Sequence, residues 1–123
     1  MFEQDYVMRL IREMVRAVLK LVFQIDSEPV TAELLDTKED RELFERLLRL
    51  VDKGRIEEAE ELVRMLGRDD GSLKLALLFY SALNEKSDAF LEANGFSREQ
   101  IKAGLIEIAD RFALGDLTHL FLN

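Results

Sequence analysis

The sequence has no cysteine and no tryptophan, and it has only one proline and one histidine. Without cysteine, neither a disulfide framework nor a thiolate zinc site can form. The histidine, His119, has only Asp116 near it at helical spacing, which is too few ligands for a metal site. We therefore expect no metal and no cofactor, and we predict that His119 is a surface residue.

The chain also lacks the features of several protein classes. Its longest uncharged apolar run, residues 75–83, is far shorter than the roughly twenty residues that cross a bilayer. Glu3 and Asp5 stand where a secretory signal would carry positive charge. Glycine-rich phosphate loops, nucleophile elbows, Rossmann fingerprints and Glu-x-x-His iron ligands are missing. These observations predict a cytoplasmic protein that has no transmembrane segment and is not an enzyme.

Positive charge is scarce outside the first 25 residues. The chain has 17 Lys and Arg residues against 25 Asp and Glu residues, a formal net charge of −8. Residues 1–25 hold four cations and three anions, so the other 98 residues hold 13 cations and 22 anions, or −9. Duplex affinity comes chiefly from clustered Lys and Arg that neutralise phosphates. We therefore expect no nucleic-acid partner.

The sequence is rich in hydrophobic periodicity of the helical kind, and it has no period-two alternation that would indicate strands. We predict an all-α, single-domain bundle of about five to seven helices. A chain of 123 residues can bury roughly two-thirds of its unfolded surface in one core. The predicted parts are a long N-terminal helix over 1–25, a helical hairpin over 38–66, central and C-terminal helices over 72–113, and a docking tail over 115–123 that includes Leu117, Leu120 and Phe121.

Local signals indicate where helices begin and end. Pro29 should end the first helix near Asp26, because proline disfavours helix in the residue before it. Ser97 and Gln100 form a capping box that should begin the last helix. Gly104, inside that helix, costs about 1 kcal/mol relative to alanine, so we predict a close crossing by another helix there.

Two middle segments differ sharply in polarity. The helix predicted over 73–84 is apolar on nearly every side, which places it in the middle of the bundle. The helix predicted over 55–66 has four glutamates in its first two turns, which we interpret as a solvated face near the positive end of the helix dipole. These glutamates are Glu57, Glu58, Glu60 and Glu61.

The N-terminal helix combines a charged stripe with a wide apolar arc. At about 100° per residue, its four cations fall within about 80° and its apolar side chains sweep about 200°. A first apolar row has the four-and-three spacing that suits packing along another helix, and a second row runs beside it. The first row consists of Val7, Ile11, Met14, Val18, Leu21 and Ile25, the second row of Met8, Val15, Leu19 and Val22, and the basic stripe of Arg9, Arg12, Arg16 and Lys20.

Residues 43–66 resemble a single tetratricopeptide-type helical hairpin. The residues that carry the resemblance are Gly54 in the turn, Ile56 and Ala59 at the start of the second helix, and Val63 one turn later. The segment departs from the pattern at Leu47, where a small residue is expected, at Leu66, where an alanine is expected, and in having no closing proline. A second unit about 34 residues later would put Asp88 where a turn glycine belongs. The resemblance implies one hairpin rather than an array, and with it a concave groove for a peptide.

The chain as a whole is similar to short bacterial helical proteins classed as a domain of unknown function. The similarity is clearest in the opening residues, MFEQDYVMRLIREMVRAVLKL. It implies a bacterial cytoplasmic protein and supplies neither an activity nor any functional residue.

Three functional hypotheses follow. The first is a non-enzymatic protein–protein interaction module, a homodimer in which the second row and the basic stripe, with or without the tail, face another chain; both rows could instead be filled within one chain. The second is a peripheral membrane protein with the basic stripe at anionic headgroups, although the chain lacks tryptophan and is acidic elsewhere. The third is a small enzyme built from carboxylates and Tyr80, for which the sequence shows no catalytic constellation.

Overall fold

The computed structural model describes residues 2–26 and 30–117, and these residues form helices without any β-strand. The elements, in order, are α1 (Phe2–Phe23), the 3-10 helix η1 (Ala32–Leu34), α2 (Lys38–Asp52), α3 (Ile56–Arg64), α4 (Asp70–Asn84), α5 (Asp88–Ala93) and α6 (Arg98–Arg111). The predicted all-α class is therefore confirmed.

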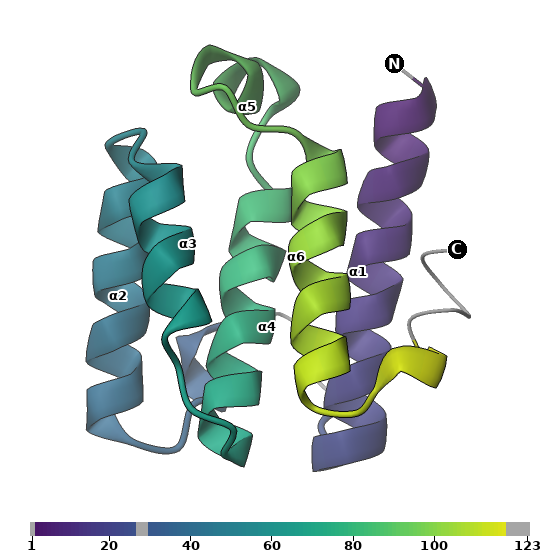
Figure 1. The fold of residues 1–123 in the computed structure, drawn as a ribbon, viewed down its shortest axis with the longest axis vertical. Helices are drawn as coiled ribbons and strands as arrows, with labels where there is room; N and C mark the ends of the chain where they lie inside the picture. The colour runs from purple at the N-terminus through teal and green to yellow at the C-terminus, as the bar shows by residue number, and fades with distance from the viewer. Residues whose placement is uncertain (1, 27–29, 118–123) are drawn as a thin grey trace.

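Helix α4 runs through the middle of the bundle (Figure 1). It packs on α1, α2 and α6, while α2 packs on α3 and α1 packs on α6. Figure 1 shows α2 and α3 on one side of α4, α1 and α6 on the other, and the short helix α5 across one end. Because α4 has neighbours on several sides, every residue from Leu73 to Tyr80 is buried. The prediction of a central helix from its all-round apolar sequence is right.

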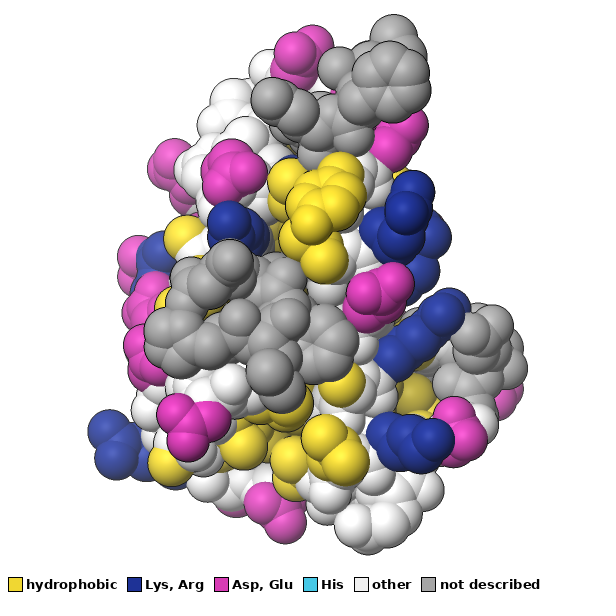
Figure 2. Space-filling model, turned by 90° about the vertical axis from the view of Figure 1, so that its right-hand side faces the viewer, with side chains coloured by type: hydrophobic (Ala, Val, Ile, Leu, Met, Phe, Trp, Pro, Cys, Tyr) yellow, Lys and Arg dark blue, Asp and Glu magenta, His cyan; other side chains and the backbone are white. Residues whose placement is uncertain are grey.

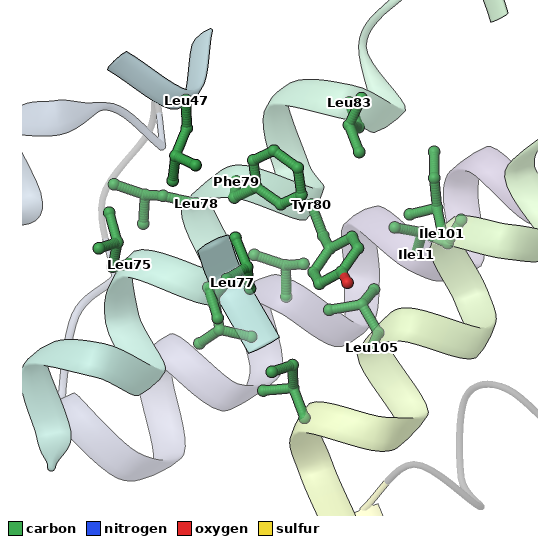
Figure 3. Packing of buried hydrophobic residues seen from close by; sticks show 14 of the residues in the cluster. Ile11, Leu47, Leu75, Leu77, Leu78, Phe79, Tyr80, Leu83, Ile101 and Leu105 are labelled. Atoms are coloured by element: carbon green, nitrogen blue, oxygen red, sulfur yellow. The ribbon is translucent and has the colours of Figure 1, made fainter. Parts of the chain in front are cut away.

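Figure 3 shows buried hydrophobic side chains of α1, α2, α4 and α6 packed together in the core. The labelled side chains are Leu75, Leu77, Leu78, Phe79, Tyr80 and Leu83 from α4, with Ile11 from α1, Leu47 from α2, and Ile101 and Leu105 from α6. Of the predicted docking tail, Leu117 is half-buried against this core. Leu120, Phe121 and His119 lie outside the described residues.

Side-chain caps begin α2, α4, α5 and α6. The Ser97 hydroxyl accepts a hydrogen bond from the Gln100 backbone N–H at 3.2 Å, as the capping box predicts. The Asp69 carboxylate accepts from the Ser72 hydroxyl at 2.7 Å and from the Ser72 N–H at 3.1 Å. These hydrogen bonds lower the pKa of Asp69. Helix α4 therefore begins at Asp70, three residues before the start that its apolar pattern predicted.

Helix α1 ends at Phe23, and the predicted stop at Pro29 is not what ends it. Gln24 has φ +56°, and the Ile25 N–H returns to the Leu19 carbonyl at 3.0 Å. A left-handed residue of this kind closes a helix by turning the chain back over its last carbonyls. The chain therefore leaves the helical path at Gln24, and Pro29 lies outside the described residues.

Gly54 lies in the turn between α2 and α3, where the sequence predicted the end of the first of these helices. Gly54 has φ +79°, a left-handed conformation that glycine adopts without steric cost. The Arg55 N–H donates to the Leu50 carbonyl at 2.9 Å, which completes the helix-ending motif. The two helices of the predicted hairpin therefore pack on each other.

Candidate functional site

Both rows predicted on α1 contribute to the core. Ile11 and Val18 from the first row are buried, and so are Val15 and Leu19 from the second row, at 1% and 2% exposure. The other members of the second row, Met8 and Val22, are half-buried. The prediction that the second row faces another chain does not agree with the burial of Val15 and Leu19. A side chain that is enclosed by its own chain cannot contact a second chain.

A different set of apolar side chains on α1 lies at the surface. Leu21, whose spacing places it in the first row, is 64% exposed, and Tyr6 is 59% exposed. Leu10 and Ala17 are half-buried between them. At 100° per residue these four residues fall within about 60°, and we call them the outer row. Figure 2 shows apolar side chains along this face of the molecule, with Lys and Arg side chains beside them.

The basic stripe beside the outer row is a solvated surface that is partly paired with acidic neighbours. The Arg12 guanidinium donates two hydrogen bonds to Glu85, each 3.1 Å long. The Lys20 ammonium lies 3.8 Å from the Asp26 carboxylate, and both side chains are exposed. Exposed pairs of this kind contribute about 0–1 kcal/mol to folding. The stripe therefore contributes charge to the outer face and little to the stability of the bundle.

A polar pair lies inside the bundle, where the sequence predicted a solvated face. Glu60 is only 6% exposed, whereas its neighbours Glu57, Glu58 and Glu61 are exposed. The Tyr80 hydroxyl of α4 donates a hydrogen bond of 2.9 Å to the Glu60 carboxylate of α3. Burial, and then the charge of Glu60, raise the pKa of Tyr80 well above its ordinary value. Tyr80 therefore keeps its proton and acts as a hydrogen-bond donor.

Gly104 of α6 makes room for this pair. A Cβ atom at this position would overlap the Tyr80 ring and hydroxyl. Figure 3 shows the Tyr80 ring directed toward α6, next to Leu105. The predicted close crossing at Gly104 is confirmed, and the helix that crosses is α4.

A small cavity of about 130 Å³ opens beside the Tyr80–Glu60 pair, between α3 and α6. Its lining residues are Glu60, Arg64, Gln100, Ala103, Gly104 and Glu107. Arg64 lies 3.3 Å from Glu60 and 3.9 Å from Glu107. Burial lowers the pKa of Arg64, but the carboxylates around it together raise it by more, so the pKa lies above its ordinary value. The wall of the cavity thus holds two carboxylates and one guanidinium. We call it the Glu60 cavity.

Arg98 is also a buried charged residue, with 2% of its surface exposed. Its guanidinium donates to the carbonyl oxygens of Asn84 at 3.1 Å and Lys86 at 2.6 Å, and it pairs with the Asp88 carboxylate. A cation is favourable at the C-terminal end of a helix, where the last carbonyls lack partners. Arg98 therefore ties the start of α6 to the end of α4 and the start of α5.

Sequence reasoning missed Glu60 and Arg98, since each is charged and stands where a solvated residue is ordinary. Two signals pointed toward the Glu60 cavity. Gly104 lowers the helix propensity of a segment that is otherwise a good helix former, and Tyr80 places a hydroxyl in the most apolar helix. A buried tyrosine hydroxyl needs a partner. Neither signal says which of the four glutamates on α3 that partner is.

Neither a metal centre nor a membrane span is found in the part of the chain that the structure describes. No three His, Cys, Asp or Glu side chains over residues 2–26 and 30–117 are arranged to hold a metal ion. None of the described helices combines the length and the apolar character that crossing a bilayer requires.

Comparison with known proteins identifies a family whose function is unknown. Residues 1–113 match the model described as a family of unknown function, DUF6483. The chain belongs to this family. The similarity to a domain of unknown function, noted from the opening residues, is thereby confirmed. The match spans α1 to α6, so the outer row and the Glu60 cavity both lie within the family domain. No curated protein and no solved structure was found to match the chain.

Proposed function

We propose that this protein is a non-enzymatic protein–protein interaction module that forms a homodimer through the outer row of α1. The observation that carries the proposal is the exposure of Leu21 and Tyr6 at the two ends of one apolar row. Large apolar side chains that share one helix face, with charged residues beside them, are typical of an interface. The proposal keeps α1 as the interacting helix and replaces the second row with the outer row.

The spacing of the outer row supports a second copy as the occupant. If two α1 helices lie antiparallel with Tyr6 opposite Leu21, then Leu10 stands opposite Ala17 in the same register, because both pairs of numbers have the same sum. Each large leucine then faces a small alanine of the other copy, on both sides of the two-fold axis. Such large-to-small pairing lets two helices approach closely. The row is therefore complementary to itself in size as well as in polarity.

The non-enzymatic part of the proposal draws on the Tyr80–Glu60 pair, which is the nearest approach to a catalytic group in the described chain. A general acid or base works best when its pKa lies near the operating pH. The pKa of Tyr80 is raised away from that range. The pair therefore supports hydrogen bonding rather than proton transfer. The bacterial cytoplasmic location and the peptide groove implied by the resemblances stay expectations.

The homodimer is tested by light scattering on a sizing column, with wild type, Leu21→Glu and the control Met65→Glu. Met65 is 78% exposed, beyond the end of α3 and away from α1, so its variant adds the same charge elsewhere. We expect a dimer mass for wild type and Met65→Glu and a monomer mass for Leu21→Glu. Val15→Glu would be a poor test, since it buries a charge in the core.

A wild-type protein that is monomeric at micromolar concentration would contradict the homodimer. If that monomer also floats with acidic vesicles and not with neutral ones, the outer row and basic stripe are a membrane-binding face instead. Circular dichroism of Leu21→Glu should match that of wild type, because Leu21 makes little contact with the core.

A further inference from the structure

We propose that the Glu60 cavity binds a primary ammonium group, carried either by a small free amine or by a lysine side chain of a partner. The cavity lies between α3 and α6, whereas the homodimer surface lies on α1. The proposal therefore does not depend on the homodimer.

The charge of the cavity wall favours a cation. Glu60 and Glu107 carry two negative charges, and Arg64 carries one positive charge, so one negative charge is left unmatched. Arg64 donates a hydrogen bond of 3.3 Å to Glu61, which is not part of the cavity wall, and it lies 3.3 Å from Glu60 and 3.9 Å from Glu107. Arg64 therefore keeps Glu61 as a partner when a second cation approaches Glu60 and Glu107. The site can therefore accept a cation without losing the pairing of Arg64.

The hydrogen-bonding capacity of the cavity favours a group with several N–H donors. Tyr80 donates to one oxygen of Glu60, and Arg64 lies near the other. Each carboxylate oxygen can accept two hydrogen bonds, so both oxygens keep accepting capacity. The carboxylate of Glu107 adds a further acceptor at the rim. An ammonium group has three donors and no acceptor, which matches such a wall.

A metal ion fits the same wall poorly. Calcium and magnesium take about six or more oxygen ligands, and the described residues place no third carboxylate or histidine with Glu60 and Glu107. The guanidinium of Arg64 would also face the ion. The volume sets the size of the ligand, since about 130 Å³ is well below the roughly 300 Å³ or more of sites for drug-sized molecules. The cavity has room for an ammonium group and a few methylenes.

The construction of the cavity wall is costly for the fold, which sets it apart from an accidental gap. Gly104 weakens the helix propensity of α6 so that Tyr80 can reach across to Glu60. Glu60 is a buried carboxylate, and well-packed apolar residues at such positions are often at least as stable. Departures from the most stable choice are expected at functional sites. Glu60 is such a departure, and it lines the cavity.

The test is an NMR titration of the full chain with n-butylammonium, followed on the backbone amides. A second arm uses Nα-acetyl-lysine amide, which presents the same ammonium group on a lysine. The control ligand is n-butanol, which has the same alkyl chain and no charge. We expect saturable shifts centred on Ala103 and Gly104 with the ammonium ligands and none there with n-butanol. Tighter binding in the first arm indicates a free amine, and tighter binding in the second a partner lysine.

Two matched variants separate a specific site from general attraction to an acidic protein. Glu60→Gln keeps an acceptor for Tyr80 and removes the charge, and we expect about tenfold weaker binding or more. Glu57→Gln removes the same charge from the exposed face of α3, and we expect a change of less than about twofold. Glu107→Gln, at the exposed rim, keeps the test valid if Glu60→Gln fails to fold, and it should weaken binding several-fold.

The absence of saturable shifts with both ammonium ligands would overturn the proposal, and so would equal weakening by Glu60→Gln and Glu57→Gln. The dimer mass of Glu60→Gln should equal that of wild type, because α1 is untouched. Failure of the ammonium site and failure of the homodimer would therefore be seen in different measurements.

Discussion

Arg98 and Glu60 are both charged and both buried, but their surroundings differ. Arg98 is enclosed by groups of its own chain, with two carbonyl oxygens and the Asp88 carboxylate around its guanidinium. Glu60 accepts from Tyr80 on one side and borders an open cavity on the other. A buried charge whose partners all come from the chain holds helices together. A buried charge with accepting capacity left at a cavity wall can also bind something else.

We expect the largest loss of stability from removing the enclosed charge of Arg98. We expect Arg98→Met to lower the free energy of unfolding by about 3 kcal/mol, because it leaves the carbonyls of Asn84 and Lys86 without their donor. Urea denaturation measures the loss. Arg55→Met is the matched control, since Arg55 makes an exposed pair with Glu58, and its loss should stay below about 1 kcal/mol. Equal losses in the two variants would mean that Arg98 is no more structural than a surface arginine.

A smaller effect should come from filling the space beside Tyr80. We expect Gly104→Ala to destabilise the protein by about 2 kcal/mol, since its methyl group overlaps the Tyr80 ring. Helix propensity alone predicts the opposite sign, a gain of about 1 kcal/mol. The control is Ala103→Gly at the exposed neighbouring position, which should lose about 1 kcal/mol through propensity. A more stable Gly104→Ala protein would contradict the close crossing.

The smallest effect concerns the Tyr80 hydroxyl, and it depends on pH. We expect Tyr80→Phe to cost about 1 kcal/mol at neutral pH through the lost hydrogen bond to Glu60. The pKa of Tyr80 is raised in the folded protein, whereas in the unfolded chain it is about 10. Above about pH 10 the unfolded chain therefore binds fewer protons than the folded protein. The free energy of unfolding of wild type then falls by up to about 1.4 kcal/mol per pH unit because of this residue.

Tyr80→Phe cannot lose that contribution, so the stability difference between the two proteins should shrink as the pH rises past about 10. Urea denaturation at neutral and alkaline pH measures the difference. Every other titratable group is the same in both proteins, so its contribution cancels in the difference. A difference that does not change with pH would mean that Tyr80 is not protected by burial and by Glu60.

The features that sequence predicted correctly depend on near neighbours in the chain. The cap at Ser97 involves residues three apart, and the turn at Gly54 needs only one left-handed residue. The central place of α4 follows from apolar residues on all of its sides. The close crossing at Gly104 was also predicted, because a glycine inside a helix lowers its stability and is expected where a neighbouring group needs the space of a Cβ atom.

The predictions that were wrong depend on contacts between helices that are distant in the chain. Leu21 continues the spacing of the buried first row and yet is exposed, while Glu60 belongs to a run of glutamates and yet is buried. In each case the residue type and the helical period are ordinary. What differs is whether another helix covers that turn, and this depends on helix ends and crossing points elsewhere in the bundle.

By itself, the sequence determined an acidic, all-helical protein, its caps and turns, its central helix and its membership of a family without known activity. Only the tertiary structure decided which face of α1 is exposed, which glutamate Tyr80 meets and which carbonyls Arg98 caps. The physical reason is the sequence separation over which each interaction acts. Helix periodicity and capping act over one or two turns, whereas the Tyr80–Glu60 bond joins positions 20 residues apart and exists only because α3, α4 and α6 meet around Gly104.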